Sequence, residues 1–104
     1  MKKKYGLQGA LQAKKGKGKD LVGILLEAAE AVATAKGCQI YVVGQDTADE
    51  DLIWVTEVWD TKKDHQNSLK IEEVKALIAR AIPLLERMPE KGLETVVLGG
   101  QGIS

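Results

Sequence analysis

Residues 57–69 read E-V-W-D-T-K-K-D-H-Q-N-S-L. This stretch predicts the end of a strand followed by the start of a helix. Glu57 and Trp59 are two residues apart, so on a strand their side chains share one face. Thr61 begins the T-x-x-D pattern of a helix start, in which the hydroxyl and the acidic side chain satisfy free backbone amides. His65, the single histidine of the chain, then falls in the first helical turn. These residues predict a corner where a large ring and a titratable imidazole meet.

The other segments show the apolar periods of strands and helices. The predicted elements are strands at 5–13, 39–45, 52–59 and 93–98, and helices at 20–35, from 61 onward, and at 72–87. Gly37 is expected to close the first helix, since glycine favours the left-handed residue after a helix end. Pro83 lies inside the last helical pattern and should kink or break it.

The element order is therefore β-α-β-β-α-β, which predicts an α+β, ferredoxin-like antiparallel sheet with its helices on one face. The strands at 39–45 and 52–59 are close in sequence and should form a hairpin. The second sheet face carries apolar side chains that nothing in the chain is left to cover. Trp54 has the opposite parity to Trp59 and should lie on that face. We expect a homodimer in which two sheet faces pack together.

Composition bounds the class of protein. A chain of 104 residues predicts one domain over 1–104, and fifteen basic residues balance fifteen acidic ones, which argues against nucleic acid or a membrane as the main partner. Cys38 is the single cysteine, so no internal disulfide forms, and no His, Cys and carboxylate set has metal-ligand spacing. The basic N-terminus lacks an apolar signal core, and no run approaches ~20 apolar residues. We expect a cytoplasmic protein without a bound metal.

Four patches carry a family resemblance. They are K-G-K-G-K-D-L at 15–21, G-C-Q-I-Y at 37–41, Glu57-x-Trp59 followed by His65, and P-L-L at 83–85. Together they resemble the antibiotic biosynthesis monooxygenase family of small dimeric α+β barrel proteins, and the resemblance covers most of the chain. It implies a dimeric α+β barrel.

Members of that family include enzymes that oxidise electron-rich phenols and quinols with dioxygen and without flavin or metal, and others that degrade heme. Gly9 stands near the position where heme-degrading relatives use asparagine, and no later histidine follows His65, so the resemblance does not extend to heme chemistry. Ser68 stands where the family often has a second histidine. The resemblance therefore implies chemistry without a cofactor.

His65 and Trp59 are the leading site residues. An imidazole titrates near neutrality, so His65 could act as general base on a phenolic proton; the alternative is a surface histidine on the first helical turn. Trp59 could stack on an aromatic substrate and offer its indole N–H, or it could be a core tryptophan between sheet and helices.

Glu57, Tyr41 and Asn67 are also assigned to substrate binding. Glu57 could orient His65 or a substrate hydroxyl, or act as a structural hydrogen-bond partner. Tyr41 could donate a hydrogen bond inside the pocket or simply pack. Asn67 and Ser68 are both polar and near His65; the alternative is that one of them faces solvent only.

Two functions follow. The first is a cofactor-independent monooxygenase that acts on a small phenol, quinol or polyketide-like aromatic. The second is a non-catalytic dimer of the same fold that binds a small ligand or serves as a sensor domain, which the serine at position 68 favours.

Overall fold

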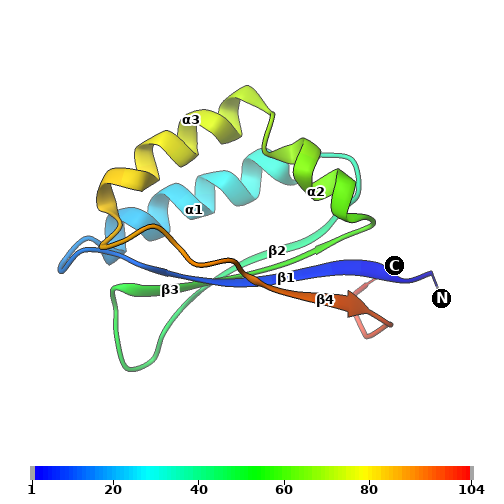
Figure 1. The fold of residues 1–104 in the computed structure, drawn as a ribbon, viewed down its shortest axis with the longest axis horizontal. Coiled ribbons are helices and arrows are strands. Elements are labelled where there is room, and N and C mark those ends of the chain that lie inside the picture. Colours follow the sequence, from blue (N-terminus) through cyan, green and yellow to red (C-terminus); the bar gives the residue numbers. More distant parts are fainter. Residues whose placement is uncertain (1, 104) are drawn as a thin grey trace.

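The computed structural model describes residues 2–103 as one antiparallel sheet with helices on one face (Figure 1). The elements are β1 (Lys4–Gln12), α1 (Gly18–Val32), β2 (Cys38–Gln45), β3 (Leu52–Trp59), α2 (Lys62–Ser68), α3 (Glu72–Ala81), the 3-10 helix η1 (Ile82–Leu84) and β4 (Leu93–Val97). The strand order is β2-β3-β1-β4, and every pairing is antiparallel. The predicted α+β, ferredoxin-like fold is confirmed.

The ends of two helices differ from the predicted ones. Helix α1 ends at Val32, three residues before the predicted end, because the amide of Ala35 donates to the carbonyl of Val32 in a tighter turn. Gly37 closes this turn and has a φ of 82°, so its left-handed conformation is confirmed although it does not cap the helix. Pro83 lies in η1, which confirms the predicted break; the helical pattern stops there instead of reaching residue 87.

The start of α1 is held by a residue from the β2–β3 hairpin. Lys17, at the N-cap position, makes no side-chain cap. Asp51 takes this role: its Oδ1 accepts from the amide of Gly18 at 2.9 Å, and its Oδ2 accepts from the amide of Gly16 at 3.0 Å. A carboxylate at a helix start accepts hydrogen bonds from the free backbone amides, and its negative charge interacts favourably with the positive end of the helix dipole. The hairpin and α1 are thereby joined.

The sheet separates a helix-covered inner face from an outer face. Helices α1 and α3 lie side by side over the inner face, and α2 lies at one end of it (Figure 1). Trp59 is fully buried on the inner side, with 0% of its surface exposed. Trp54 has 39% of its surface exposed on the outer face, so the predicted opposite orientation of the two tryptophans is confirmed. Within residues 2–103, no helix covers the outer face.

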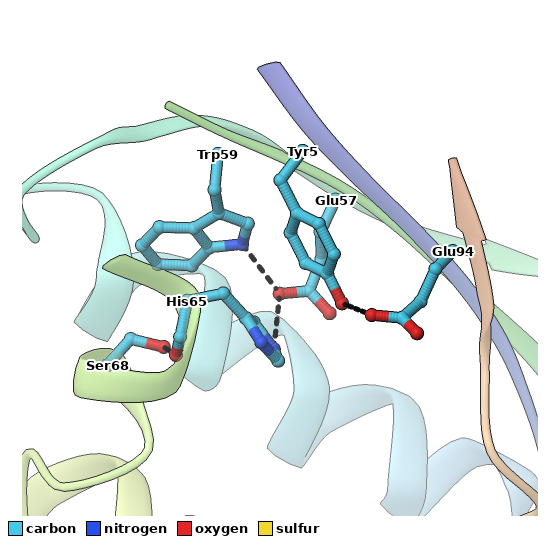
Figure 2. A network of polar contacts seen from close by, with 6 residues as sticks. All are labelled: Tyr5, Glu57, Trp59, His65, Ser68 and Glu94. Atoms are coloured by element: carbon cyan, nitrogen blue, oxygen red, sulfur yellow. Dashed lines mark hydrogen bonds and ion pairs between the residues drawn. The ribbon is translucent and has the colours of Figure 1, made fainter. Parts of the chain in front are cut away.

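The predicted helix start at Thr61 is confirmed. The Thr61 hydroxyl accepts a hydrogen bond from the amide of Asp64 at 3.0 Å, and α2 begins at the next residue. This cap places His65 one turn into α2, facing back over the end of β3 (Figure 2). Of the helices described, none has the length and apolar character needed to cross a membrane.

Candidate functional site

A cavity of about 350 Å³ lies between the inner sheet face and helices α1 and α3. Most of its lining is aliphatic and comes from β1, α1, α3 and η1. Its polar lining residues are Tyr41, Glu57, His65, Ser68 and Glu90. This combination of an apolar wall with a few polar groups is typical of a small-molecule site.

Glu57 is the buried carboxylate of this site. It lies on β3 between Leu7 of β1 and Tyr41 of β2, and 12% of its side chain is exposed. Its Oε1 accepts a hydrogen bond from Nε1 of Trp59 at 3.0 Å (Figure 2). Burial raises the pKa of Glu57, and the hydrogen bond from Trp59 opposes that rise.

His65 faces this carboxylate from α2. Its Nε2 lies 3.7 Å from Oε1 of Glu57, and 14% of its side chain is exposed. Its ring stands edge-on to Trp59, with centroids 5.7 Å apart. Burial lowers the pKa of His65; the negative charge of Glu94 opposes this shift, and the positive charge of Lys62 adds to it. Because its pKa lies below the ordinary 6.5, His65 is neutral at pH 7 and able to accept a proton.

Tyr5 and Glu94 adjoin the site and were not among the predicted site residues. The Tyr5 ring lies 5.8 Å from His65, and its hydroxyl donates to Oε2 of Glu94 at 2.8 Å (Figure 2). Lys62 at 2.9 Å and Lys91 at 3.2 Å also contact the Glu94 carboxylate. The hydrogen bonds from Lys62, Tyr5 and Lys91 lower the pKa of Glu94 to about 2, and burial together with Glu94 raises the pKa of Tyr5 to about 12. This network ties β4 to the start of α2.

The four residues assigned to substrate binding are placed differently. Glu57 and Tyr41 line the cavity, and burial raises the pKa of Tyr41. Trp59 stands behind Glu57, outside the lining, and reaches the cavity only through its hydrogen bond to that carboxylate. Asn67 is exposed on α2 and outside the lining. The structure thus brings His65, Glu57 and Tyr41 to one end of the cavity, while the roles of all these residues stay predictions.

Ser68 occupies the position next to this polar end. It is buried, and its hydroxyl donates to the backbone carbonyl of His65 (Figure 2). Cys38 is partly buried, and burial followed by the charge of Glu57 raises the pKa of its thiol. Over residues 2–103, no three His, Cys, Asp or Glu side chains are grouped so that they could hold a metal ion.

The fold and the cavity define a small α+β protein whose helices enclose an apolar site with one polar end. The family model of antibiotic biosynthesis monooxygenases matches residues 5–80, and the chain belongs to this family. No sequence among the curated proteins matches it.

Solved structures agree with the family. A candidate antibiotic biosynthesis monooxygenase from Chloroflexus aurantiacus J-10-fl is 42% identical, with a TM-score of 0.87 over 97% of this chain and 99% of that one. Two further candidate antibiotic biosynthesis monooxygenases share the fold at low identity. The one from Nitrosomonas europaea is 14% identical, with a TM-score of 0.86 over 91% of this chain and 90% of that one. The one from Caulobacter crescentus CB15 is 18% identical, with a TM-score of 0.79 over 96% and 92%.

Proposed function

We propose that the protein is a cofactor-independent monooxygenase that oxidises a small phenol, quinol or polyketide-like aromatic with dioxygen. One observation carries the proposal: in a chain of this family, a neutral imidazole and a buried carboxylate face each other at the polar end of an apolar cavity. Nε2 of His65 and Oε1 of Glu57 are 3.7 Å apart there.

The reaction balances without an external reductant. A phenol with an open para position and one dioxygen give a quinone and one water: one oxygen atom enters the ring, and the other leaves as water with the two hydrogens that the substrate loses. A hydroquinone gives a hydroxyquinone and water in the same way. The substrate supplies all four electrons, so the protein needs to provide a proton acceptor and a site that excludes water.

His65 accepts the hydroxyl proton in this scheme. The resulting imidazolium lies beside Glu57, whose carboxylate stabilises the new positive charge. Trp59 holds that carboxylate in place through its indole N–H. The aliphatic wall then surrounds a phenolate whose charge is poorly solvated, and a poorly solvated phenolate is a stronger electron donor to dioxygen.

Oxygen uptake with a panel of phenols and hydroquinones under air tests this proposal. We expect His65→Ala to lower the enzymatic rate by at least 10²-fold, which is the scale of a general base. Gln66→Ala is the control, because Gln66 is the exposed neighbour on the same helix and should leave the rate unchanged. A panel in which no substrate exceeds the uncatalysed rate, or an unchanged rate in His65→Ala, contradicts the mechanism.

A non-catalytic ligand-binding or sensor domain is the second candidate. The Ser68 hydroxyl is bonded to the carbonyl of its own helix, so it supplies no second base beside His65. Ligand-dependent thermal shifts without oxygen uptake support this function, and turnover by the purified protein excludes it as a complete account.

We further propose that the protein forms a homodimer through the outer sheet face. Support comes from the large apolar side chains exposed there: Val42 is 53% exposed and Trp54 39%. Leu93 belongs to the same face by its pairing with Gln8 and is 64% exposed. Light scattering coupled to size exclusion should give the mass of a dimer, and Val42→Glu should shift it toward the monomer. A monomer in the unchanged protein contradicts this assembly.

A further inference from the structure

The cavity follows the inner face of the sheet, and Tyr41, Glu57 and His65 lie together in its lining. Strand pairing orders the inner residues of the sheet: Leu7 is opposite Glu57, Gly9 opposite Val55, and Leu11 opposite Ile53. The step from Leu7 to Leu11 spans about 13 Å along β1. Tyr41 and Glu57 lie beside Leu7, and His65 contacts Glu57 from α2. The inner sheet residues beyond Leu7 are apolar, and Glu90, after Met88 and Pro89, is the one charged residue among the other described lining residues.

The far end is lined by side chains that suit a hydrocarbon. Leu11 of β1, Ala81 of α3, Ile82 of η1 and Leu85 line it. Met88 also lines the cavity and has 65% of its surface exposed. Apart from the imidazole of His65, Tyr41 is the single aromatic residue among the described lining residues. Flat aromatic walls would favour a ring along the whole length, but mobile aliphatic side chains pack equally well on a flexible chain.

The polar end favours a neutral hydroxyl over an anion. None of the described lining residues is Lys or Arg, while Glu57 and Glu90 both line the cavity. A carboxylate or phosphate head group would be desolvated there without a cationic partner, which is costly. A hydroxyl can donate to the carboxylate or to the neutral imidazole of His65.

Gly9 keeps the passage between the two ends open. It lies on the inner face of β1 and lines the cavity, and a Cβ added to it would meet no atom within 4 Å. Its φ is not in the left-handed region, so the backbone does not require glycine. Any larger side chain at this position would project into the space between Glu57 and Leu11. Position 9 thus controls how far a ligand can extend beyond the polar end.

We propose that the site binds a hydroxylated ring carrying a straight aliphatic tail, with the hydroxyl at Glu57 and His65 and the tail extending past Gly9 toward Leu85. This rests on the proposed function for the ring, and it adds the tail as the feature that the site selects. The roughly 13 Å of passage leaves room beyond the ring for a tail of roughly six carbons. Each buried methylene is worth about 0.8 kcal/mol, or about fourfold in affinity, before the cost of ordering the tail.

The test is titration calorimetry under nitrogen with hydroquinone and its 2-alkyl derivatives from methyl to octyl. The expected result is a gain in affinity of two- to fourfold per methylene, levelling off after about six carbons. Gly9→Val should remove this dependence on tail length, so that it weakens the binding of octylhydroquinone far more than the binding of hydroquinone. Gly44→Val is the matched control, because Gly44 lies in a strand and on the outer face. In this variant the affinity should depend on tail length as it does in the original protein. Octanoate should bind at least tenfold more weakly than octylhydroquinone.

Affinities that do not change with tail length in the unchanged protein overturn the proposal, whatever the variants do. The proposal is also overturned if affinity depends on tail length equally in Gly9→Val and Gly44→Val. Oxygen uptake measured separately under air distinguishes this failure from failure of the proposed function. If hydroquinone is turned over but affinity does not change with tail length, only the proposal of an aliphatic tail is overturned. A rising series without any oxygen uptake overturns the monooxygenase and leaves the tail proposal standing.

Discussion

Replacing Trp59 by Phe tests how the buried carboxylate of the site is held. The substitution keeps an aromatic ring in a fully buried position and removes the indole N–H that donates to Oε1 of Glu57 at 3.0 Å. Two losses follow. The smaller ring leaves a cavity, which costs about 1–2 kcal/mol. The carboxylate loses a hydrogen-bond donor, which costs about 1.5–3 kcal/mol when the acceptor is charged.

The second loss depends on pH. The hydrogen bond from Trp59 favours the ionised form of Glu57, so its removal raises the pKa of Glu57 further above the ordinary value of 4.5. When the pKa of an acid is higher in the folded state than in the unfolded state, its protonated form stabilises the fold. This stabilisation is complete at a pH below the unfolded-state pKa and is lost as the pH rises through the folded-state pKa. As the pH rises, the free energy of unfolding should therefore fall more in Trp59→Phe than in the original protein. We expect a total loss of about 3–4 kcal/mol at pH 8 and about 2 kcal/mol at pH 4, where Glu57 is protonated and its hydrogen bond is an ordinary neutral one.

Urea denaturation followed by far-ultraviolet circular dichroism at the two pH values measures this difference. Trp54→Phe is the matched control, because its ring is exposed on the outer face and its N–H goes to the exposed carboxylate of Asp46. In a Glu57→Gln background, the cost of Trp59→Phe should no longer depend on pH. An equal cost at pH 4 and pH 8 in the original background, or a larger one at pH 4, refutes the reasoning.

Three further predictions concern the scaffold and the base. Asp51→Ala removes the acceptor of two amides at the start of α1, so urea denaturation should show a loss of about 1–2 kcal/mol. Gly37→Ala places an alanine in the left-handed conformation against the buried carboxylate of Asp64, which should cost about 2–4 kcal/mol of stability. Gly23→Ala, on the exposed face of α1, is the control and should stabilise the protein by about 0.5–1 kcal/mol. Equal effects of the two substitutions would contradict the backbone strain expected at position 37. Because burial lowers the pKa of His65, oxygen uptake should decline on the acid side with a midpoint below pH 6.5, and Glu94→Gln should lower that midpoint further. A midpoint at or above 6.5 contradicts His65 as the base.

Much of the candidate site could be predicted from local patterns. Strand parity placed Glu57 and Trp59 on one face and Trp54 on the other, and the structure has them there. The cap at Thr61 predicted a helix that carries His65 near its start, and His65 is the fourth residue of the short helix α2, in its last turn. These predictions succeed because the alternation of a strand and the geometry of a helix start depend on residues within a few positions of one another.

Contacts between distant segments could not be predicted in this way. Parity does not distinguish a residue that lines a cavity from one that stands behind it, and only packing against α1 and α3 puts Glu57 in the lining and Trp59 outside it. The pairing of β1 with β4, which brings Tyr5 to Glu94, joins residues 89 positions apart.

The two ends of residues 57–69 show where this boundary lies. The strand, the cap and the helix that carry Glu57 and His65 depend on short-range backbone geometry and on side-chain alternation. Local sequence patterns therefore predict them. The 3.7 Å approach of the two side chains, the shifts of their pKa values and the open space above Gly9 arise only when β1, β3 and the helices enclose one volume. Burial and empty space are properties of that enclosure, so no local pattern encodes them.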